Sequence, residues 1–210
     1  MDPKRIVQDG YDRMYRRFDG WSSGSDDARG WFRRQVLDRL PSGAAVLELG
    51  CGAGTDAAVL ADGRAYIGVD LSSGQLSLAR ERLPDLTFLL GDLAHLSFPD
   101  GTFDAVVAFY VFNHVPRAEQ GPAFERIFRW LRPGGWLMAS LGAGDSDDEI
   151  QEDWLGVPMF FASFDPDTNE RLLRAAGFEL DVSETRSQIE EGEVEAAFQW
   201  VIARRPGVAG

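Results

Sequence analysis

Residues 45–54 read Ala-Val-Leu-Glu-Leu-Gly-Cys-Gly-Ala-Gly, a short apolar run that enters a turn with three glycines. The apolar run predicts a buried β-strand, and Thr55 to Leu60 is expected to begin a helix after the turn. Glycines at such a turn let the backbone approach a ligand closely, and the amino end of a helix offers free N–H groups. The stretch therefore predicts a strand, turn and helix that form part of a ligand-binding site.

The segments that follow repeat this pattern of strand and helix. Apolar runs typical of strands occur at 65–70, 86–90, 105–109 and 135–140. Helices are expected between them, at 73–83 and 122–131. Strands that alternate with helices at this spacing predict an α/β fold with a parallel, doubly wound sheet.

Further elements are expected at both ends of the chain. Apolar residues at helical spacing predict helices at 4–19 and 31–40, with a loop at 20–27 between them. Residues 142–165 show neither helical nor strand periodicity and are expected to be irregular. A closing helix and two more strands are expected at 169–176, 178–185 and 198–203.

The length of 210 residues fits a single domain. We expect four regions within it: an N-terminal helical cap at 1–43, a cofactor-binding core at 44–141, an acceptor loop or lid at 142–168, and a closing helix with two strands at 169–205.

The spacing of the glycines separates two classes of nucleotide-binding protein. Dinucleotide-binding proteins carry G-x-G-x-x-G, which would need a glycine at position 55. Thr55 stands there, and the third glycine is Gly54, so the pattern is G-x-G-x-G. A dinucleotide oxidoreductase is therefore the less favoured alternative.

Acidic residues end the next two strands. Asp70 follows the second strand, where a carboxylate can accept both hydroxyls of a ribose, and Asp92 follows the third, where it can accept from an adenine amino group. A glycine turn alone closes many α/β units, and Asp70 alone could cap a helix. Because these residues occur in order at strand ends, we favour a bound adenosine-type nucleoside over structural coincidence.

Five motifs carry a family resemblance: Val-Leu-Glu-Leu-Gly-Cys-Gly-Ala-Gly (46–54), Gly-Val-Asp-Leu-Ser (68–72), Gly-Asp-Leu (91–93), Phe-Pro-Asp-Gly-Thr-Phe-Asp (98–104) and Leu-Arg-Pro-Gly-Gly (131–135). In these motifs the chain resembles the class I S-adenosylmethionine-dependent methyltransferases, closely over about 45–141, and Ala-Gly-Phe at 176–178 continues the resemblance. The resemblance implies a Rossmann-like sheet of seven strands in the order 3-2-1-4-5-7-6, with the last strand antiparallel. It also implies S-adenosyl-L-methionine as cofactor and S-adenosyl-L-homocysteine as product.

The resemblance further implies a set of cofactor-binding residues: Tyr11, Glu48, Gly50, Cys51, Gly52, Asp70, Leu71, Asp92, Leu93, Ala108 and Phe109. By this resemblance the glycines lie against the methionine part of the cofactor, and Asp70 holds the ribose. Leu71 flanks the adenine, and Asp92 with Leu93 contacts its edge. Ala108 and Phe109 face the sulfonium, while Tyr11 closes over the cofactor or, alternatively, only packs within its helix.

His114 is the candidate general base, because it follows the fourth strand beside the expected methyl group and its ordinary pKa near 6.5 suits proton transfer. A structural or cofactor-adjacent role for His114 is the alternative. Asn113 is expected to orient the acceptor. A nitrogen acceptor needs no base, so O- and N-methylation both remain open.

The apolar residues at 154–164 follow the fifth strand, at the sheet edge where ligands of such folds bind. They are expected to form an acceptor pocket, and simple packing on the sheet is the alternative. The expected substrate contacts are Tyr15, Phe18, His114, Trp154, Met159, Phe160 and Phe164. The acceptor is then a small, flat, aromatic or apolar molecule, as in the tailoring of bacterial natural products.

The charge of −13 is concentrated late in the chain. Residues 1–141 hold 18 acidic and 16 basic residues, whereas 142–210 hold 16 acidic and 5 basic. This acidity argues against nucleic acid as a partner and leans towards neutral or cationic acceptors. The acidic loop at 145–153 is expected to be solvated or, alternatively, to attract an amine.

Other partners are limited by composition. One cysteine and two histidines do not suggest a metal site, and Cys51 is expected to pack rather than to act as a nucleophile. No apolar run reaches the length of a membrane-spanning helix, so we expect a cytoplasmic protein without a membrane partner. Whether the protein is a monomer or a homodimer stays open.

Fold and cofactor do not fix the reaction. The alternative to methyl transfer is a protein that binds S-adenosylmethionine without transferring its methyl group, such as a cyclase or a binding module.

Overall fold

The computed structural model describes residues 2–22, 27–190 and 194–207, with side chains at all of these positions except 18–22, 27, 188–190, 194 and 195. The expected side-chain contact of Phe18 lies outside the described side chains.

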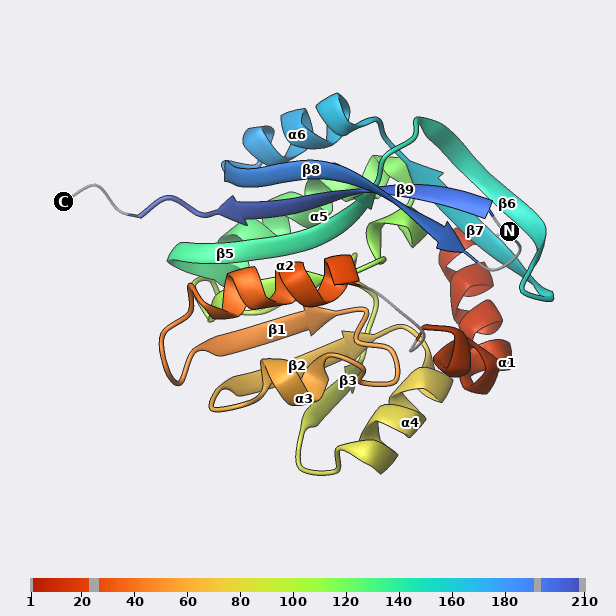
Figure 1. The fold of residues 1–210 in the computed structure, drawn as a ribbon, viewed down its shortest axis with the longest axis horizontal. Coiled ribbons are helices and arrows are strands. Elements are labelled where there is room, and N and C mark those ends of the chain that lie inside the picture. Colours follow the sequence, from red (N-terminus) through yellow and green to blue (C-terminus); the bar gives the residue numbers. More distant parts are fainter. Residues whose placement is uncertain (1, 23–26, 191–193, 208–210) are drawn as a thin grey trace.

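A seven-stranded sheet forms the centre of the molecule (Figure 1). Its strands are β1 (Ala45–Leu49), β2 (Ala65–Asp70), β3 (Thr87–Leu90), β4 (Phe103–Ala108), β5 (Leu131–Gly142), β8 (Glu179–Glu190) and β9 (Val194–Arg204). They lie in the order β3-β2-β1-β4-β5-β9-β8, and β9 runs antiparallel to both of its neighbours. Counted within this sheet, the order is 3-2-1-4-5-7-6, so the predicted topology is confirmed.

Helices cover both faces of the sheet. One face packs against α5 (Arg117–Trp130) and α6 (Pro166–Ala175), and the other packs against α2 (Asp27–Leu37), α3 (Ala57–Leu60) and α4 (Ser73–Arg82). Central strand residues such as Leu47, Val106 and Leu137 are fully buried. Burial on both faces explains why these strands read as continuous apolar runs rather than alternating ones.

Several helices differ in extent from the prediction. Helix α1 (Pro3–Ser22) continues beyond the predicted end at 19, and α2, which was expected at 31–40, spans Asp27–Leu37. Helix α5 begins at Arg117 and contains Pro122, which the sequence reading placed at the start of the helix. Residues 117–122 already form the first turns of the helix, and Pro122 is exposed. Helix α3 has only four residues, Ala57–Leu60, because a series of turns occupies the positions after the glycines.

The expected irregular segment at 142–165 is instead a β-hairpin, and that prediction is wrong. Strands β6 (Ser146–Trp154) and β7 (Val157–Ser163) pair antiparallel in a separate two-stranded sheet. Leu155 and Gly156, both with positive φ (52° and 87°), form the tight turn between them. Strand periodicity is absent from the sequence because Met159 and Phe160, adjacent in β7, are both buried.

Helix α1 (Pro3–Ser22) lies against this hairpin at the end of the sheet towards which β1 points (Figure 1). A third apolar cluster joins the two elements and includes Ile6, Val7, Met14, Val157 and Met159. Of the two helices in the predicted cap at 1–43, α1 lies over the carboxyl ends of the parallel strands, whereas α2 packs on one face of the sheet.

Polar contacts fix α1 to the rest of the domain. The Asp12 carboxylate accepts from Ser72 Oγ at 2.6 Å and from Gly74 N at 2.9 Å, so it caps the amino end of α4. The exposed Arg17 donates from Nη1 to the carbonyl of Leu155 at the tip of the hairpin, at 3.1 Å.

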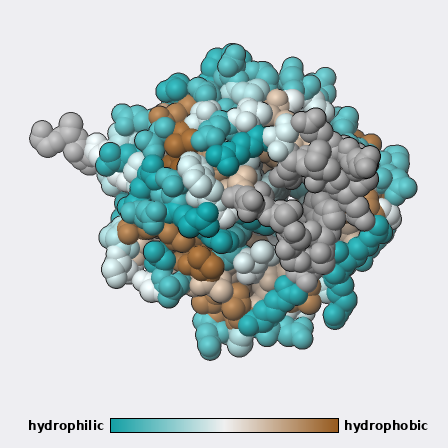
Figure 2. All heavy atoms as spheres, viewed as in Figure 1, coloured by the Kyte–Doolittle hydropathy of each residue, from teal (hydrophilic) through white to brown (hydrophobic). Residues whose placement is uncertain are grey.

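The face of the molecule in Figure 2 is mainly hydrophilic, with small scattered hydrophobic groups, among them some at its lower edge and some at its upper left. Among the helices that the structure describes, none combines the length and the hydropathy needed to cross a membrane.

We predict that Asp12→Ala loosens α1 without unfolding the sheet. The variant loses hydrogen bonds to a helix terminus, worth about 1.5–3 kcal/mol when the acceptor is charged. Hydrogen exchange at the backbone amides of α1 should become about tenfold to hundredfold faster, while exchange in β1 and β4 stays unchanged. Asp9→Ala is the matched control, because within the described part of the chain the ion pair of exposed Asp9 is with Arg5 on the same helix. Equal exchange rates in the Asp12 variant and the control would contradict this role of Asp12.

Candidate functional site

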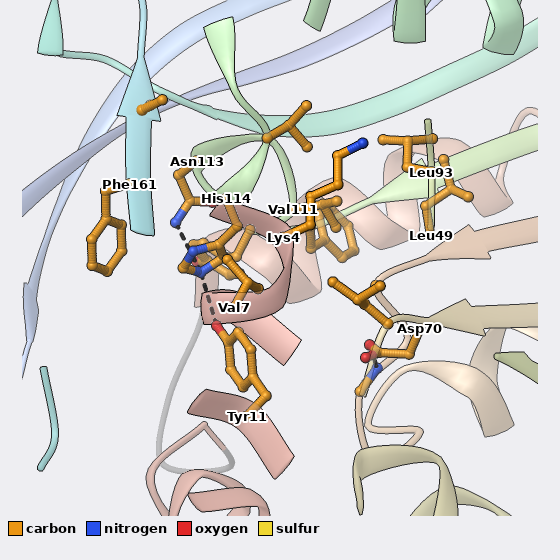
Figure 3. A pocket seen from close by; sticks show the side chains of 18 of the residues that line it. Lys4, Val7, Tyr11, Leu49, Asp70, Leu93, Val111, Asn113, His114 and Phe161 are labelled. Carbon is orange, nitrogen blue, oxygen red and sulfur yellow. Dashed lines mark hydrogen bonds between the residues drawn. The ribbon is translucent and has the colours of Figure 1, made fainter. Parts of the chain in front are cut away.

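A cavity of about 820 Å³ opens at the carboxyl ends of β1, β2, β3 and β4 and continues beneath α1 and the β6–β7 hairpin. Its position agrees with the general rule that ligands of open parallel sheets bind outside the carboxyl ends of the strands. Figure 3 shows part of its wall, with Asp70 on one side and the group Tyr11, Asn113 and His114 on the other.

The glycine turn after β1 forms the floor of the cavity. Gly50 has φ of +65°, and a Cβ there would lie 2.3 Å from Val111 Cγ2, so no larger residue fits without rearrangement. Gly52 has φ of +53°, but the nearest atom to a Cβ there is Gln75 Oε1 at 3.7 Å. The first glycine is therefore required by close packing, whereas the second leaves space for a ligand.

Asp70 lies at the end of β2 and lines the cavity. Its carboxylate accepts from Gly52 N and from Ser72 N, each at 2.8 Å. Burial raises the pKa of Asp70, and the backbone donors from Ser72 and Gly52 oppose that shift. Each carboxylate oxygen has a second lone pair, so the group can still accept from a ligand.

At the end of β3, Asp92 and Leu93 line the next part of the cavity. Lys4 from α1 pairs with Asp92 Oδ2 at 3.1 Å and with Glu119 Oε2 at 2.6 Å. Asp92 Oδ2 also accepts from His95 Nδ1 at 2.8 Å. The pKa of Asp92 is lowered: burial raises it, but the Ala94 amide and the contacts with Lys4 and His95 outweigh that effect. Asp92 is thus an anion held by a cation from the cap.

Glu48 and Ala108, both expected to bind the cofactor, are not part of the cavity wall. Ala108 is fully buried within the sheet, and Glu48 is 3% exposed and lies beneath the glycine turn. Glu48 accepts from the Tyr66 hydroxyl, and burial, reinforced by nearby Asp56, raises its pKa to about 8. Cys51 does line the cavity, but burial raises the pKa of its thiol strongly, which keeps it protonated.

The remaining expected cofactor residues line the same cavity: Tyr11, Gly50, Cys51, Gly52, Asp70, Leu71, Asp92, Leu93 and Phe109. They come from α1 and from the ends of four strands, so the fold brings together residues that are far apart in the sequence.

His114 connects three elements through its imidazole ring. Its Nδ1 lies 2.8 Å from the carbonyl oxygen of Phe160 in β7, so this nitrogen carries the proton and donates. Burial lowers the pKa of His114 to about 4, which leaves the ring neutral near pH 7. Nε2 is therefore an acceptor, and the Tyr11 hydroxyl donates to it at 2.9 Å (Figure 3).

Asn113 lines the cavity beside this pair. Its Nδ2 approaches His114 Nε2 at 3.5 Å, and among the described residues its Oδ1 is buried without a hydrogen-bond partner. A second donor at Nε2 further favours the tautomer in which that nitrogen has no proton.

Aromatic rings surround the His114 side of the cavity. Tyr11, Trp154 and Phe161 each pack edge-on or tilted against His114, with ring centroids 5.4, 6.1 and 4.9 Å away. All four residues line the cavity. This part of the wall suits a flat apolar molecule.

Other residues expected to contact the substrate lie elsewhere. Met159 and Phe160 are buried in the cluster under α1, although the Phe160 carbonyl reaches His114. Tyr15 contacts Gly74 of α4. Phe164 packs against the Arg117 guanidinium, 4.1 Å from its ring centroid. Of the expected substrate contacts with described side chains, His114 and Trp154 line the cavity.

Arg117 also contacts part of the acidic segment at 145–153, which was expected to be a loop and lies mostly in β6. Its guanidinium pairs with Asp145 at 2.6 Å and with Asp147 at 2.7 Å, and its amide donates to Asp148 at 3.0 Å. Asp145, Asp147 and Asp148 thus all contact Arg117.

Several residues of the cavity wall were not found from the sequence: Lys4, Arg29, Gln75, Tyr110, Val111 and Phe198. Tyr110 and Val111 follow β4 directly, so a closer reading of strand ends would have included them. Lys4 and Arg29 belong to the N-terminal helices, and no local pattern shows where those helices pack.

The chain matches the family model described as a methyltransferase domain over residues 46–135. It is 39% identical over 137 residues to a demethylmenaquinone methyltransferase of Beutenbergia cavernae, an alignment that covers 62% of this chain and 55% of that relative. The chain thus spans about half the length of this relative.

Solved structures share the fold. A 1,6-didemethyltoxoflavin-N1-methyltransferase of Burkholderia thailandensis, with bound S-adenosylhomocysteine, has a TM-score of 0.72 at 21% identity, covering 98% of this chain and 91% of that one. The 4+2-cyclase SpnF has a TM-score of 0.73 at 18% identity, covering 99% and 98%. The match to a methyltransferase domain, together with the glycine spacing, decides against the dinucleotide oxidoreductase.

We predict that Glu48 makes stability depend on pH. Its pKa is about 8 in the folded protein against an ordinary 4.5, so the folded state binds the proton more tightly. The stabilisation that comes from this bound proton is complete below the pKa of Glu48 in the unfolded chain. It is lost as the pH rises through the pKa of Glu48 in the folded protein. As the pH rises from about 4.5 to 8, the free energy of unfolding of the wild type should therefore fall relative to that of Glu48→Gln, whose side chain cannot ionise.

Urea unfolding followed by tryptophan fluorescence across that pH range measures this difference. Glu125→Gln, at an exposed position of α5, is the control. A constant difference between the Glu48 variant and the wild type would show that folded Glu48 is ionised throughout.

Proposed function

We propose that this chain, a member of the class I S-adenosylmethionine-dependent methyltransferases, transfers a methyl group to an oxygen or nitrogen atom of a small aromatic or apolar molecule. The observation that carries the proposal is a single cavity that reaches from Asp70 and the glycine turn to the Tyr11–His114 pair. One wall suits the nucleoside of the cofactor and the other suits a flat acceptor.

The cavity fits S-adenosylmethionine in size and chemistry. Its volume of about 820 Å³ leaves room for a nucleoside cofactor together with a small acceptor. Gly52 leaves space above the turn, and the nearby Gln75 Nε2 is buried without a hydrogen-bond partner among the described residues. A ligand with acceptor atoms at this position would satisfy that donor.

We assign the nucleoside contacts by the chemistry of the wall. Asp70 would bind the ribose hydroxyls with its remaining lone pairs, and Leu71 and Leu93 would enclose the adenine. Asp92 would accept from the adenine amino group while Lys4 holds it in place.

The Tyr11–His114 pair would position the acceptor and remove its proton where it has one. When bound, the cofactor supplies a methyl group on a positively charged sulfur and gives up that charge on transfer. An acceptor hydroxyl that donates to Tyr11 Oη would pass its proton there, as the Tyr11 proton moves to His114 Nε2. Since His114 would gain charge as the sulfur loses it, the total charge of the cavity stays constant, which offsets the burial that lowers the pKa of His114.

A second function is favoured by one observation. The fold of the chain is as similar to that of a cyclase as to that of a methyltransferase with bound S-adenosylhomocysteine. Binding of the cofactor without methyl transfer is therefore the competing proposal.

Incubation with methyl-labelled S-adenosylmethionine and a panel of phenols, hydroquinones and heteroaromatic amines separates the two proposals. Transfer of label to an acceptor, with release of S-adenosylhomocysteine, is the expected result. Tight cofactor binding by calorimetry with no labelled product from any acceptor would favour the competing proposal.

We predict that Asp70→Ala weakens S-adenosylhomocysteine binding by at least about tenfold, because charge-assisted hydrogen bonds to the ribose are lost. Asp70→Asn keeps the shape of the side chain and isolates the effect of the charge. Isothermal titration calorimetry measures the dissociation constant, with exposed Asp85→Ala as control. An unchanged dissociation constant in both Asp70 variants would remove Asp70 from the ribose site.

We predict that His114→Gln and Tyr11→Phe each lower turnover of a hydroxyl acceptor by about 10² or more, the usual size of general-base catalysis. The dissociation constant of S-adenosylhomocysteine should change by less than about threefold, since the pair faces the acceptor. Steady-state kinetics with an acceptor from the panel gives the first quantity, and calorimetry the second. Full turnover by both variants would leave His114 and Tyr11 with a packing role.

A further inference from the structure

Tyr110 lines the cavity in a backbone conformation that residues with side chains rarely adopt. Its φ is +56°, and among the described non-glycine residues Leu155, in the turn of the β6–β7 hairpin, is the other with a positive value. In this region Cβ comes too close to a carbonyl oxygen, so the conformation costs energy and persists where other contacts hold it. The hairpin turn accounts for Leu155, whereas strain at Tyr110, in a cavity wall, points to a role in the site.

A buried hydroxyl holds Tyr110 in this conformation. Ser140 lies in β5 within the run 137–141, whose other members are apolar, and it is fully buried. Backbone pairing between β4 and β5 ends at Ala108 and Ala139. The Tyr110 amide then donates to Ser140 Oγ at 2.7 Å, so a side chain satisfies the donor that leaves the sheet. Ser140 thereby fixes the direction in which the chain turns out of β4.

Aromatic and cationic neighbours hold the Tyr110 ring. It lies edge-on against Phe198 and Trp200 of β9, with ring centroids 4.9 and 5.7 Å away, and the Arg29 guanidinium carbon lies 5.4 Å from its centroid. Phe198 and Trp200 are themselves buried, so they cannot move aside without repacking of the core. The ring is therefore a rigid part of the cavity wall.

Tyr110 lies between two parts of the cavity. The strand order reverses between β1 and β4, which is where ligands of such sheets bind. On the cofactor side, the next residue, Val111, packs against Gly50 of the glycine turn. On the other side, the Tyr110 ring touches Phe198, which pairs with Gly142 at the end of β5. Tyr110 thus separates the glycine turn from the end of β5.

The wall beyond Tyr110 is built from small residues: Gly142, Ala143, Gly144, Ser163, Ala196 and Ala197. They gather at one place, because the Ala143 amide donates to the Ala197 carbonyl and a Cβ on Gly142 would lie 2.4 Å from Ser163 Cβ. None of these side chains is larger than a hydroxymethyl group. On this side, the bulk that limits the space therefore comes from Tyr110 and Phe198.

We propose that Tyr110 determines which acceptors fit, and that Ser140 is a positioning residue that holds the Tyr110 ring at the boundary between cofactor and acceptor. The acceptor would place a flat ring against Tyr110 and its substituents over the small residues at the ends of β5 and β7. Acceptors with a bulky group directed at Tyr110 would be excluded. The inference rests on the proposed acceptor site and adds the residue that sets its size.

Binding to the complex saturated with S-adenosylhomocysteine tests the proposal without requiring turnover. The probes are compact phenols, hydroquinones and heteroaromatic amines, each compared with its tert-butyl derivatives, and calorimetry gives the dissociation constants. The wild type should favour a compact compound over at least one derivative by about tenfold or more, and Tyr110→Ala should reduce that preference by about tenfold or more. Tyr110→Phe is the matched control, because it keeps the ring and should retain the preference.

Ser140→Ala tests the positioning. It leaves the Tyr110 amide without its buried acceptor, so the preference should fall in the same direction as in Tyr110→Ala. Ser140→Thr restores a hydroxyl at this position and should recover the wild-type preference. If Ser140→Ala lowered the free energy of unfolding and left the ratio of the two dissociation constants unchanged, Ser140 would have a structural role alone.

A measurement on the wild type keeps the proposal falsifiable even if Tyr110→Ala does not fold. The chain has four tyrosines, so labelling of tyrosine rings gives few signals, and Tyr110→Phe identifies those of Tyr110. Nuclear Overhauser contacts between a bound probe and the Tyr110 ring are the expected result. Their absence would overturn the proposal, as would an unchanged preference in Tyr110→Ala or the failure of every probe to bind.

The outcome is separable from that of the proposed reaction. A protein that selects among the probes through Tyr110 and yet methylates none of them would retain this inference and lose the proposed function. A protein that methylates an acceptor, with the same preference in the wild type and in Tyr110→Ala, would retain the function and lose this inference.

Discussion

The Asp70 carboxylate is the contact on which the arrangement of the site depends. It accepts from Gly52 and Ser72, so it fixes the glycine turn after β1 and the start of α4 relative to each other. Ser72 in turn donates to Asp12 of α1, which sets the position of the helix that carries Tyr11. Asp70, which is expected to bind the ribose, thus also begins a series of contacts that ends at α1, the helix over the cavity.

That chain connects the two halves of the proposed reaction. Tyr11 lies one residue before Asp12 and donates to His114, which is fixed in turn by the Phe160 carbonyl of β7. The nucleoside side and the acceptor side therefore share one helix as their common support. The packing of α1 against β7 also excludes water from His114. This burial keeps the imidazole ring neutral and able to accept a proton at Nε2.

The sequence predicted the sheet and its ligand-binding edge because these depend on local patterns. Apolar runs, a glycine turn and Asp70 are close together in the chain, and each can be recognised without knowing what it packs against. The hairpin was missed because its turn is Leu155-Gly156 rather than an Asn-Gly pair, and because α1 buries consecutive residues of β7. Arg29 was missed for a related reason: its place in the cavity wall depends on where α2 packs, and that is decided by tertiary contacts rather than by spacing.

The acidic last third of the chain acts mainly outside the cavity. Of its 16 acidic residues, Asp153 alone lines the described part of the wall, and the cations there, Lys4, Arg29 and Arg126, all come from earlier in the chain. Three of these carboxylates, Asp145 just before β6 and Asp147 and Asp148 within it, instead contact Arg117. The net charge therefore says little about the acceptor. The rings of Tyr11, His114, Trp154 and Phe161 are the stronger constraint, because they form the surface that an acceptor would touch.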